Sequence, residues 1–572
     1  MEKTKECQSG ITLVALVVTI IVLLILAGIS IQMLTGDNGI LTKAGEAKKL
    51  NDIGREKEEI SLVYTSLVGK EVLNEEKITD IVFEKELNKN GYNTIVGYDD
   101  ENNYLVYFND TKRTYKVDKN GNTITELENA PSLVTETIYV TLYSDGTLAF
   151  SSNSETDSTK TVTKKYTVEK DDLYDSQEKV PWVNEVNSVK KIDFVNEIIP
   201  TSTARWFRNL ANLSTIENLV NLKTNRVIDM SYMFSGCGLT TLNLNTLDTR
   251  KVKSMRAMFS NCLNLTDLDL KSFNTSEVTD MYSMFYNCKK ITNLDLSNFD
   301  TRSVTNMRSM FNSCSGLTSL NVSNFDTSNV TTMYAMFSSC SILTSLNLSS
   351  FNTSKVTDMY CMFYHCNELT SLDLSRFDTS NVTTMYCMFC GCNNLTSIDL
   401  SRFDTGNVTT MYCMFCNCNK LTSLDLSHFN TNKVNSMQGM FQNCWNLTSV
   451  NVSKFDTSNV TTMRNMFYSC IKLQELDLSS FDTRNLEITR WMFCGWDDKN
   501  DTDLVMEIKK IYVSSLWKMS KITDDYNMFS NCRNLVGGNG TTYSYNKKDS
   551  SYARIDGGPK SSTPGYFTYK GN

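Results

Sequence analysis

The chain has 572 residues, with 56 Lys plus Arg against 64 Asp plus Glu and a formal net charge of −8. Proteins that bind nucleic acid through their surface carry a basic stripe, so this balance argues against a nucleic-acid partner. The chain contains only two histidines, His365 and His428, which argues against an acid–base or metal enzyme built on histidine. Neither a Gly-rich phosphate loop nor a Ser-His-Asp arrangement stands out in the sequence. We therefore expect a protein that is not an enzyme and that has no catalytic residue, no cofactor and no bound metal.

The first structural element in the chain is an uncharged run of 21 residues, Ile11–Ile31. At 1.5 Å per residue a helix of this length spans roughly 32 Å, which is enough to cross a bilayer. The sequence therefore predicts a single-pass transmembrane helix and a location in the cell membrane. The ten residues before it hold two lysines and two glutamates, so charge alone does not fix the orientation of the span.

The apolar run begins with the sequence Gly10-Ile-Thr-Leu-Val. This start resembles a type IV prepilin leader, and the resemblance implies cleavage between Gly10 and Ile11. The chain departs from that pattern at Ala15, where prepilins carry a glutamate. A plain membrane anchor that is not processed is the alternative interpretation.

A helix and two β-rich regions are predicted between the apolar run and the repeats. Residues 36–39, Gly-Asp-Asn-Gly, should end the first helix, and residues 40–68 then predict a second helix with a solvated face. Residues 92–128 predict a small antiparallel β unit with a hairpin signal at Asn120-Gly121. Residues 131–185 predict a further β-rich stretch. The order of anchor, helix and small sheet resembles a pilin or pseudopilin head.

From about Val227 to Trp496 the sequence repeats one pattern of 26 residues. A clear copy spans residues 369–394, LTSLDLSRFDTSNVTTMYCMFCGCNN. A fixed period of this length is typical of a solenoid, in which each copy forms one turn of a continuous coil. The phenylalanine of the Met-Phe pair recurs every 26 residues after a single 25-residue step, at positions 234, 259, 285, 311, 337, 363, 389, 415, 441, 467 and 493.

Each copy predicts one strand, one turn and one short helix. The opening Leu-x-x-Leu-x-Leu run alternates as a strand does, and strands of successive copies must pair in parallel because all run the same way. Phe-Asp-Thr or Phe-Asn-Thr then predicts a turn. The spacing of Val382, Met385, Met388 and Phe389 predicts one face of a short helix. The predicted fold is an α/β repeat solenoid of leucine-rich-repeat-like turns, preceded by the transmembrane helix and small β-rich domains.

The Leu-Asp-Leu-Ser, Phe-Asp-Thr and Met-Phe-x-x-Cys elements of these copies resemble the BspA-type leucine-rich repeats of bacterial surface proteins, over about residues 186–570. The resemblance implies an extracellular solenoid that binds a protein or glycan ligand on host or bacterial surfaces, as an adhesin does. It also implies caps at both open ends, one of them around residues 200–207. A different function remains open, namely a structural type IV pilus or pseudopilus subunit that displays the solenoid.

These patterns divide the chain into seven regions. They are a leader and transmembrane helix (1–35), a helical stalk (36–70), a small pilin-like α+β head (71–130), a β-rich linker domain (131–185), an N-terminal solenoid cap (186–230), the 26-residue repeats (231–500) and a C-terminal cap (501–572). In this division the repeats form one continuous region, and a cap covers each of its two open ends.

The chain contains 18 cysteines, of which eleven follow the Met-Phe pairs as a column. A column of buried thiols that act as small hydrophobic groups explains them, although neighbouring turns are close enough for disulfides. Cys387-x-x-Cys390 and Cys413-x-x-Cys416 look like paired zinc ligands. A sister copy holds Ala335 at the same place and keeps the same framework, so we expect no zinc site.

A column three residues before each phenylalanine is rich in tyrosine and arginine. Its core-side neighbours are methionine and phenylalanine, so we expect it to face outward. Exposed Tyr and Arg dominate protein-binding hot spots, which suggests a ligand-binding strip. The alternative is that the tyrosines only cover apolar surface between turns. The strip consists of Arg256, Tyr282, Arg308, Tyr334, Tyr360, Tyr386, Tyr412, Arg464 and Arg490, with Gln438 interrupting it.

Overall fold

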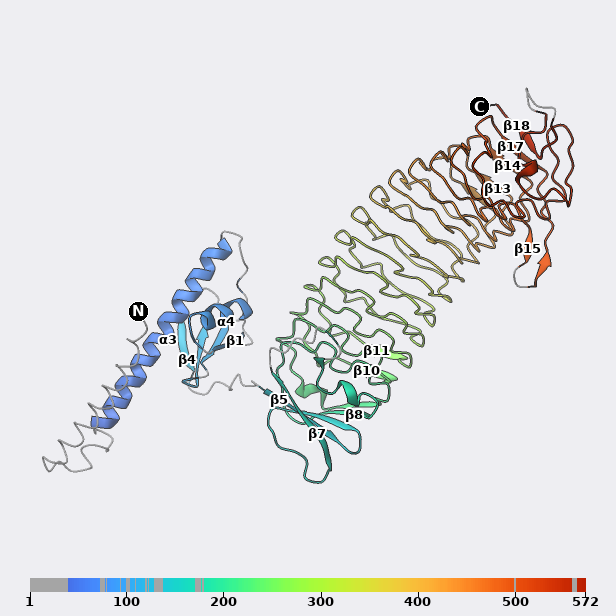
Figure 1. The fold of residues 1–572 in the computed structure, drawn as a ribbon. Helices are drawn as coiled ribbons and strands as arrows, with labels where there is room; N and C mark the ends of the chain where they lie inside the picture. Colours follow the sequence, from blue (N-terminus) through green and yellow to red (C-terminus); the bar gives the residue numbers. More distant parts are fainter. Residues whose placement is uncertain are drawn as a thin grey trace, which may run out of the picture. The chain divides into compact units, whose positions relative to one another are not determined.

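The computed structural model forms two compact units, Met1–Val134 and Thr135–Asn572 (Figure 1). The candidate membrane helix Ile11–Ile31 and the candidate cleavage position Gly10–Ile11 lie outside the residues that the structure describes. Among the helices it does describe, none is both long and apolar enough to cross a bilayer. The described residues are 40–72, 78, 80–92, 94–98, 103–108, 110–118, 121, 123–127, 137–169, 176, 179–497, 500–557 and 563–571.

The first unit packs two helices against a four-stranded antiparallel sheet. Its core joins both helices to the sheet through the rings of Tyr64, Phe83 and Tyr104, whose centroids lie 5.3–5.8 Å apart. The carboxylate of Glu56 on the first helix is buried and accepts hydrogen bonds from Tyr115 at 2.6 Å and Arg113 at 3.0 Å. The elements are α3 (Ile40–Val72), α4 (Asp80–Lys89), β1 (Thr94–Tyr98), β2 (Tyr104–Phe108), β3 (Arg113–Val117) and β4 (Ile124–Leu127), with sheet order β1-β2-β3-β4.

The second unit begins with a five-stranded sheet that changes from antiparallel to parallel pairing. β5 pairs with β6 and β7 in antiparallel fashion, whereas β6–β8 and β8–β9 are parallel pairs. One end of the sheet is thus antiparallel, and the other end has the parallel pairing that the coil continues. It is built from β5 (Thr137–Tyr143), β6 (Thr147–Ser151), β7 (Val162–Glu169), β8 (Lys191–Phe194) and β9 (Thr215–Glu217), in the order β7-β5-β6-β8-β9.

This sheet differs from the predicted division at residue 185, because its strands come from both sides of that boundary. The rings of Phe150, Trp182 and Trp206 pack together within 5.2–6.4 Å and are almost fully buried. The short 3-10 helices η2 (Val183–Glu185) and η3 (Leu219–Asn221) lie beside the parallel edge. Residues 137–230 therefore act together as the cap that covers the first turn of the coil.

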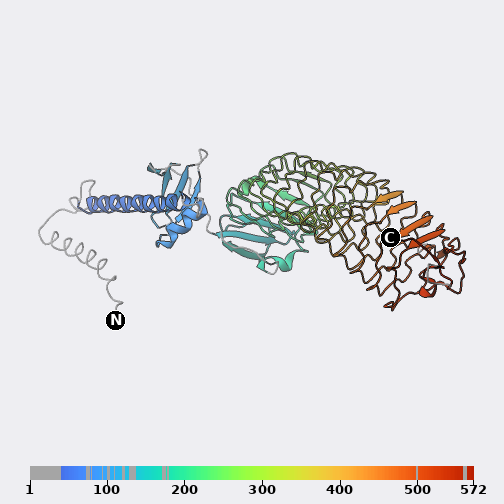
Figure 2. The same cartoon turned by 90° about the horizontal axis from the view of Figure 1, so that it is seen from above.

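The coil itself confirms the repeat architecture predicted from the 26-residue period. Parallel strands occur in the register predicted, with Leu242 opposite Leu268 and Leu424 opposite Val450. The predicted strand is absent from several described central copies, where the same stretch is extended without full pairing. Successive turns lie one behind another along a gently bending coil (Figure 2). The strands are β10 (Thr241–Asn243), β11 (Asp267–Asp269), β12 (Ser423–Asp425), β13 (Ser449–Asn451) and β14 (Glu475–Leu478).

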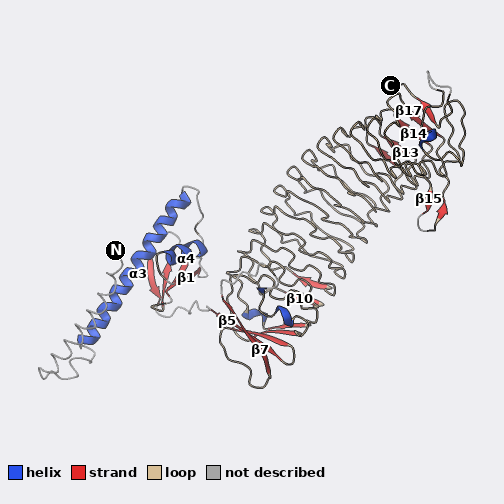
Figure 3. Cartoon of the chain, viewed as in Figure 1, coloured by secondary structure: helices blue, strands red, loops and turns tan. Residues whose placement is uncertain are grey.

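The prediction of a short helix in each copy is wrong, because this stretch is a run of turns (Figure 3). Amide groups alternate between two partners along the stretch. The amides of Ala257 and Phe259 bond to carbonyls of the next copy at 2.7 and 2.9 Å, whereas that of Met258 bonds three residues back at 3.2 Å. Ala257 and Asn261 have left-handed backbones, with φ of 50° and 60°. Bonds between copies therefore replace the continuous i−4 pattern of an α-helix.

A column of stacked phenylalanines fills the interior of the coil. From Phe234 to Phe529, neighbouring rings lie 5.4–5.9 Å apart with interplanar angles of 2–16°. Methionine and leucine columns surround it and are buried. The cysteine column is also buried, and each thiol, such as that of Cys366, donates to a phenylalanine carbonyl of the preceding turn at 2.9–3.2 Å. All cysteines in the described residues are thiols, as the small-hydrophobe interpretation requires.

The C-terminal end of the coil departs from the period. Phe493 and Phe529 are 36 residues apart, and the ten extra residues form a two-stranded hairpin. A parallel sheet of order β14-β17-β18 then closes the coil, with Trp517 and Phe567 in ring contact at 5.0 Å. The elements are β15 (Trp496–Asp497), β16 (Thr502–Asp503), β17 (Lys510–Val513), η4 (Ser550–Tyr552) and β18 (Phe567–Tyr569).

Candidate ligand-binding strip

The strip residues form one column along the coil, each in the run of turns just before the Met-Phe pair. All are half-buried, with part of each residue exposed. Each strip residue lies between a bridging residue two positions earlier and a left-handed residue that follows it. Tyr360, for example, follows Asp358, whose carboxylate accepts from the Tyr360 amide at 2.9 Å, and precedes Cys361 with φ of 53°. This fixed backbone holds the strip in register with the coil.

The four central tyrosines stack face to face. Centroid distances are 4.6 Å for Tyr334–Tyr360, 4.5 Å for Tyr360–Tyr386 and 4.4 Å for Tyr386–Tyr412, with interplanar angles of 2–6°. Burial raises the pKa of Tyr360 above its ordinary value, with nearby thiols adding to the effect. Each ring face within the stack is covered by the next ring, so the stack leaves ring edges and not ring faces for further contacts.

Arginines continue the column on the N-terminal side of the stack. The guanidinium of Arg308 lies 3.7 Å from the Tyr334 ring centroid, and that of Arg256 lies 3.9 Å from the ring of Tyr282. Arg256 also bonds to the Asp280 carboxylate at 3.3 Å. Cation–π contacts of this kind hold a guanidinium in place and leave its outer edge accessible.

The strip extends beyond the residues that the sequence pattern identified. Tyr232 lies in the preceding turn. The guanidinium groups of Arg205 and Arg208 lie 4.8 and 4.7 Å from the centroid of its ring. At the other end, Arg490 lies 4.4 Å from Trp491 and 4.6 Å from Tyr526. Tyr232 stands directly before Met233, one position later in the repeat than the strip residues, so the pattern did not include it. Trp491 has the same offset, and Tyr526 is at the strip position of the turn after the break in the period.

Beneath the central tyrosines lies a second, smaller apolar cluster. It consists of Ala335, Cys361, Cys387, Cys390, Cys413 and Cys416, and the strip tyrosines pack against it. These cysteines are 5–9% exposed, so the tyrosines cover them. The tyrosines therefore cover apolar surface between the turns, as the alternative interpretation expected.

The two Cys-x-x-Cys motifs come together in this cluster. The thiol of Cys387 is in hydrogen-bonding contact with Cys361, Cys390 and Cys413, and Cys416 contacts Cys390 and Cys413. Among the described residues, no group of three His, Cys, Asp or Glu side chains has a geometry that could hold a metal ion. The cluster in this arrangement is a network of thiols.

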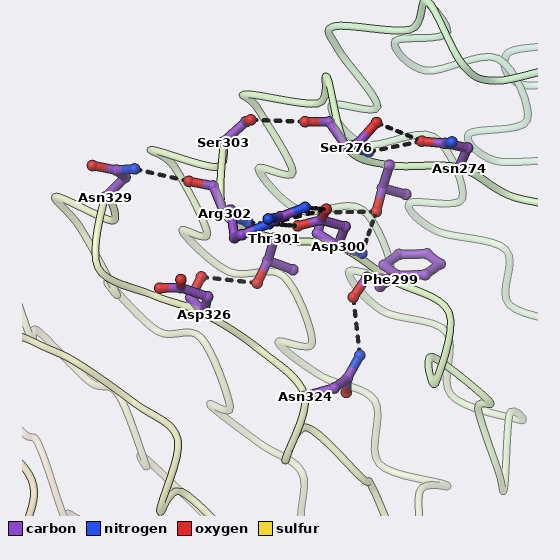
Figure 4. A network of polar contacts seen from close by, with 11 residues as sticks. Asn274, Ser276, Phe299, Asp300, Thr301, Arg302, Ser303, Asn324, Asp326 and Asn329 are labelled. Carbon is purple, nitrogen blue, oxygen red and sulfur yellow. Dashed lines mark hydrogen bonds and ion pairs between the residues drawn. The ribbon is translucent and has the colours of Figure 1, made fainter.

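The Asp and Asn column that follows each core phenylalanine serves the backbone (Figure 4). The Thr301 hydroxyl donates to the carbonyl of Asp326 at 2.8 Å, and the Asp300 carboxylate bonds to Arg302. Asn329 donates to the carbonyl of Arg302 at 2.8 Å, and Asn324, Ser303 and their neighbours make similar bonds across turns. These hydrogen bonds connect neighbouring turns, and they are consistent with a column of Asp and Asn that forms the turn in each copy.

The family comparison matches the repeating half of the chain. The matching family model is described as a Mycoplasma protein of unknown function, DUF285, and it aligns with residues 201–319, 290–397, 367–451 and 422–550. Together these segments span residues 201–550, which is more than half of the chain. The chain belongs to the DUF285 family. Every residue of the Tyr and Arg strip lies within the DUF285 segments.

Two further comparisons were made for this DUF285 chain. Among solved structures, it is similar to a leucine-rich repeat protein from Eubacterium ventriosum ATCC 27560, with 15% sequence identity and a TM-score of 0.27. The alignment covers 70% of this chain and 97% of that chain. The comparison with curated proteins found no match.

Proposed function

We propose that this protein is a membrane-anchored bacterial surface protein of the BspA-like type, whose solenoid binds a protein or glycan ligand on host or bacterial surfaces. The observation that carries the proposal is the column of Tyr and Arg along one side of the coil, with four tyrosines stacked at its centre. Tyr and Arg dominate hot spots, and a strip already locked by stacking loses little entropy on binding. The proposal gives the protein no catalytic role.

The edges of the stacked rings are the groups proposed to contact the partner. Replacing Tyr334, Tyr360, Tyr386 and Tyr412 together by phenylalanine keeps the stack and the cover over the cysteine cluster, but removes the hydroxyls. We expect the full-length variant to lose at least tenfold in affinity for its partner, with an unchanged far-UV circular dichroism spectrum. Replacing the same four residues by alanine should abolish binding.

The partner is sought by pull-down with the full chain against extracts of host matrix and of bacterial surfaces. A Tyr569→Phe variant serves as the control, because this exposed tyrosine lies in the C-terminal cap outside the strip. Undiminished capture of the same partner by both fourfold variants would contradict the strip as the binding surface.

The proposed membrane anchor is the apolar run Ile11–Ile31, whose length matches the thickness of a bilayer. Membranes from cells that make the protein should retain it after washing at high salt and at alkaline pH. Deleting residues 11–31 should release it into the soluble fraction. Release of the unaltered chain by the washes alone would rule out the anchor.

A pilus or pseudopilus subunit is the second candidate, and one observation favours it. The long helix α3 packs with α4 on an antiparallel sheet of four strands, an arrangement similar to a pilin head. Mass spectrometry of the mature N-terminus separates the two candidates. A chain that starts at a methylated Ile11 supports the pilus route, whereas an intact Met1 or a cut elsewhere supports the plain anchor.

A further inference from the structure

A cavity of about 540 Å³ lies beside the last turns of the coil. Aromatic and polar side chains line it, and those that matter most are Trp491, Trp496, Tyr526, Tyr545, Asn465 and Lys548. The volume lies within the range of small-molecule binding sites, and a few polar groups among aromatic rings is their usual lining.

The cavity exists because the period breaks at this point. Trp496 belongs to β15 and Asp503 to β16, the hairpin made by the ten-residue insertion (Figure 1). Tyr545 and Lys548 come from the chain that follows the last Met-Phe pair. The insertion thus adds walls to a surface that is otherwise a flat series of identical turns.

Trp491 is held in a conformation that disfavours its side chain. Its φ is 57°, the left-handed backbone that this position of the repeat adopts in every copy. Most copies hold a smaller residue there, such as Ala257, Ser283 or Ala335, because a bulky side chain is uncommon at such a φ. The indole lies between the guanidinium groups of Arg464 at 5.2 Å and Arg490 at 4.4 Å, which hold it at the cavity wall.

Carboxylates neutralise part of the positive charge around the cavity. Arg490 pairs with Asp524 at 3.4 Å, and Arg533 pairs with Asp503 at 3.2 Å. Lys548 instead contacts the ring of Tyr545, with its ammonium group 4.7 Å from the ring centroid. A phosphate or carboxylate ligand binds best to cations that have no carboxylate partner, and both arginines here already have one, which favours an uncharged ligand.

One polar atom in the cavity wall lacks a partner. The side-chain amide nitrogen of Asn465 donates to Gln442 at 3.2 Å, but its side-chain oxygen is buried and accepts no hydrogen bond. A buried acceptor without a donor is unfavourable, and a donor from a ligand would satisfy it.

From these observations we infer that the cavity is a binding site for a short neutral saccharide. The pyranose ring presents C–H groups that suit the electron-rich faces of Trp and Tyr, and its hydroxyls both donate and accept. Asn465 would accept a hydrogen bond from a ligand hydroxyl, while Asn527 and Lys548 would donate hydrogen bonds to hydroxyl oxygens. This site goes beyond the proposed strip and does not depend on it.

The test is saturation-transfer NMR of the full chain with chitotriose, cellotriose and maltotriose as probes. The apolar run near the N-terminus requires a detergent, which must be a polyoxyethylene type because alkyl glycosides would compete for the site. Trp491→Ala tests the wall directly, and it should fold because alanine occupies this position in two other copies. A double variant, Tyr545→Ala with Lys548→Ala, tests the opposite wall through two surface-accessible residues.

We expect saturable binding of at least one trisaccharide that is weakened at least tenfold in both variants. Tyr569→Ala, an exposed aromatic outside the cavity, should bind as the unaltered chain does. The fourfold tyrosine-to-phenylalanine variant of the strip should also retain saccharide binding, which separates this site from the proposed adhesion surface. Lack of saturable binding by all three sugars, binding that the two cavity variants leave unchanged, or preferential binding of adenosine triphosphate would each overturn the inference.

Discussion

The buried threonine after each Phe-Asp or Phe-Asn pair connects neighbouring turns at a single atom. The Thr353 hydroxyl donates to the Asp378 carbonyl at 2.7 Å and accepts from the Asp378 amide at 2.8 Å. It is fully buried, so water cannot substitute for it. One hydroxyl therefore satisfies both backbone groups of one residue in the next turn.

Replacing Thr353 by valine should destabilise the coil by about 1–3 kcal/mol, because two backbone groups lose their partner while the volume stays the same. Denaturant unfolding followed by circular dichroism measures the change. Thr357→Val is the matched control, since its exposed hydroxyl donates to Thr331 at 3.3 Å, and its effect should stay within about 0.5 kcal/mol. Equal effects of the two substitutions would count against the buried bridge.

The cysteines of the buried column and those of the cluster beneath the tyrosines should differ in reactivity. Burial raises the pKa of the column thiols, to about 12 for Cys262. Hydrogen bonds from Cys387 and Cys416 instead lower the pKa of Cys390, and those same two thiols lower that of Cys413. A lowered pKa increases the fraction of thiolate at neutral pH, and the thiolate is the nucleophile.

Iodoacetamide should therefore modify Cys390 and Cys413 of the native protein before Cys392, as measured by peptide mass spectrometry. Cys390 and Cys413 are 6% and 9% exposed, whereas Cys392 is fully buried. Between pH 6 and pH 8 the rate at Cys390 should rise less steeply than that of an ordinary thiol, because its pKa is lowered. In guanidinium chloride all three should react alike; equal rates in the native protein would refute the distinction.

At the scale of elements, the end caps differ from the repeats in relying on a few specific contacts. The buried Asp556 carboxylate accepts from the amides of Asn539 at 2.9 Å and Thr541 at 3.0 Å. Burial alone would raise the pKa of Asp556, but these hydrogen bonds outweigh it and leave the pKa below its ordinary value. Two segments of the C-terminal cap thus depend on one charge.

The C-terminal cap should be the acid-sensitive end of the coil. A carboxyl with a lowered native pKa stabilises the fold above its unfolded pKa of about 3.9, and that contribution is lost as the pH falls through the native pKa. Hydrogen exchange should show residues 535–557 protected at pH 7 and opened below about pH 4. Asp556→Asn should open them at both pH values. Asp295→Asn, at an exposed turn of the coil, should not.

At the scale of the whole second unit, each turn contacts only its neighbours through the same columns. Stability should then be a sum of repeat and interface terms, and the coil should tolerate a change in length by whole periods. The stacked Phe column and the Thr bridges set the same register in every turn.

Deleting one complete copy, residues 369–394, should leave a folded protein with an unchanged shape of the circular dichroism spectrum. The turns on either side then meet with Phe363 next to Phe415, each at its proper place in the period. Deleting only residues 369–381 places unlike columns against each other and should cause aggregation or unfolding. A half-period deletion that folds as well as the full one would argue against nearest-neighbour registration.

Much of this architecture was predictable from the sequence because it depends on periodic side chains. The recurring Phe, Met, Leu and Cys required buried columns, and the common direction of the copies required parallel pairing. The helix predicted at Val382–Phe389 failed for a specific reason. Apolar spacing of three and four residues also arises when amides alternate between local carbonyls and those of the next copy, as Cys387 and Met388 do.

The candidate sites lie partly beyond what a linear pattern can show. The sequence by itself determined the Tyr and Arg column, the length of the period and the place where it breaks, because these are properties of spacing. Only the tertiary structure decided that the tyrosine faces are occupied at 4.4–4.6 Å and that Trp491, Trp496 and Tyr545 share one cavity. The reason is physical: those contacts join residues one turn or more apart, and the distance between turns is set by backbone pairing across copies.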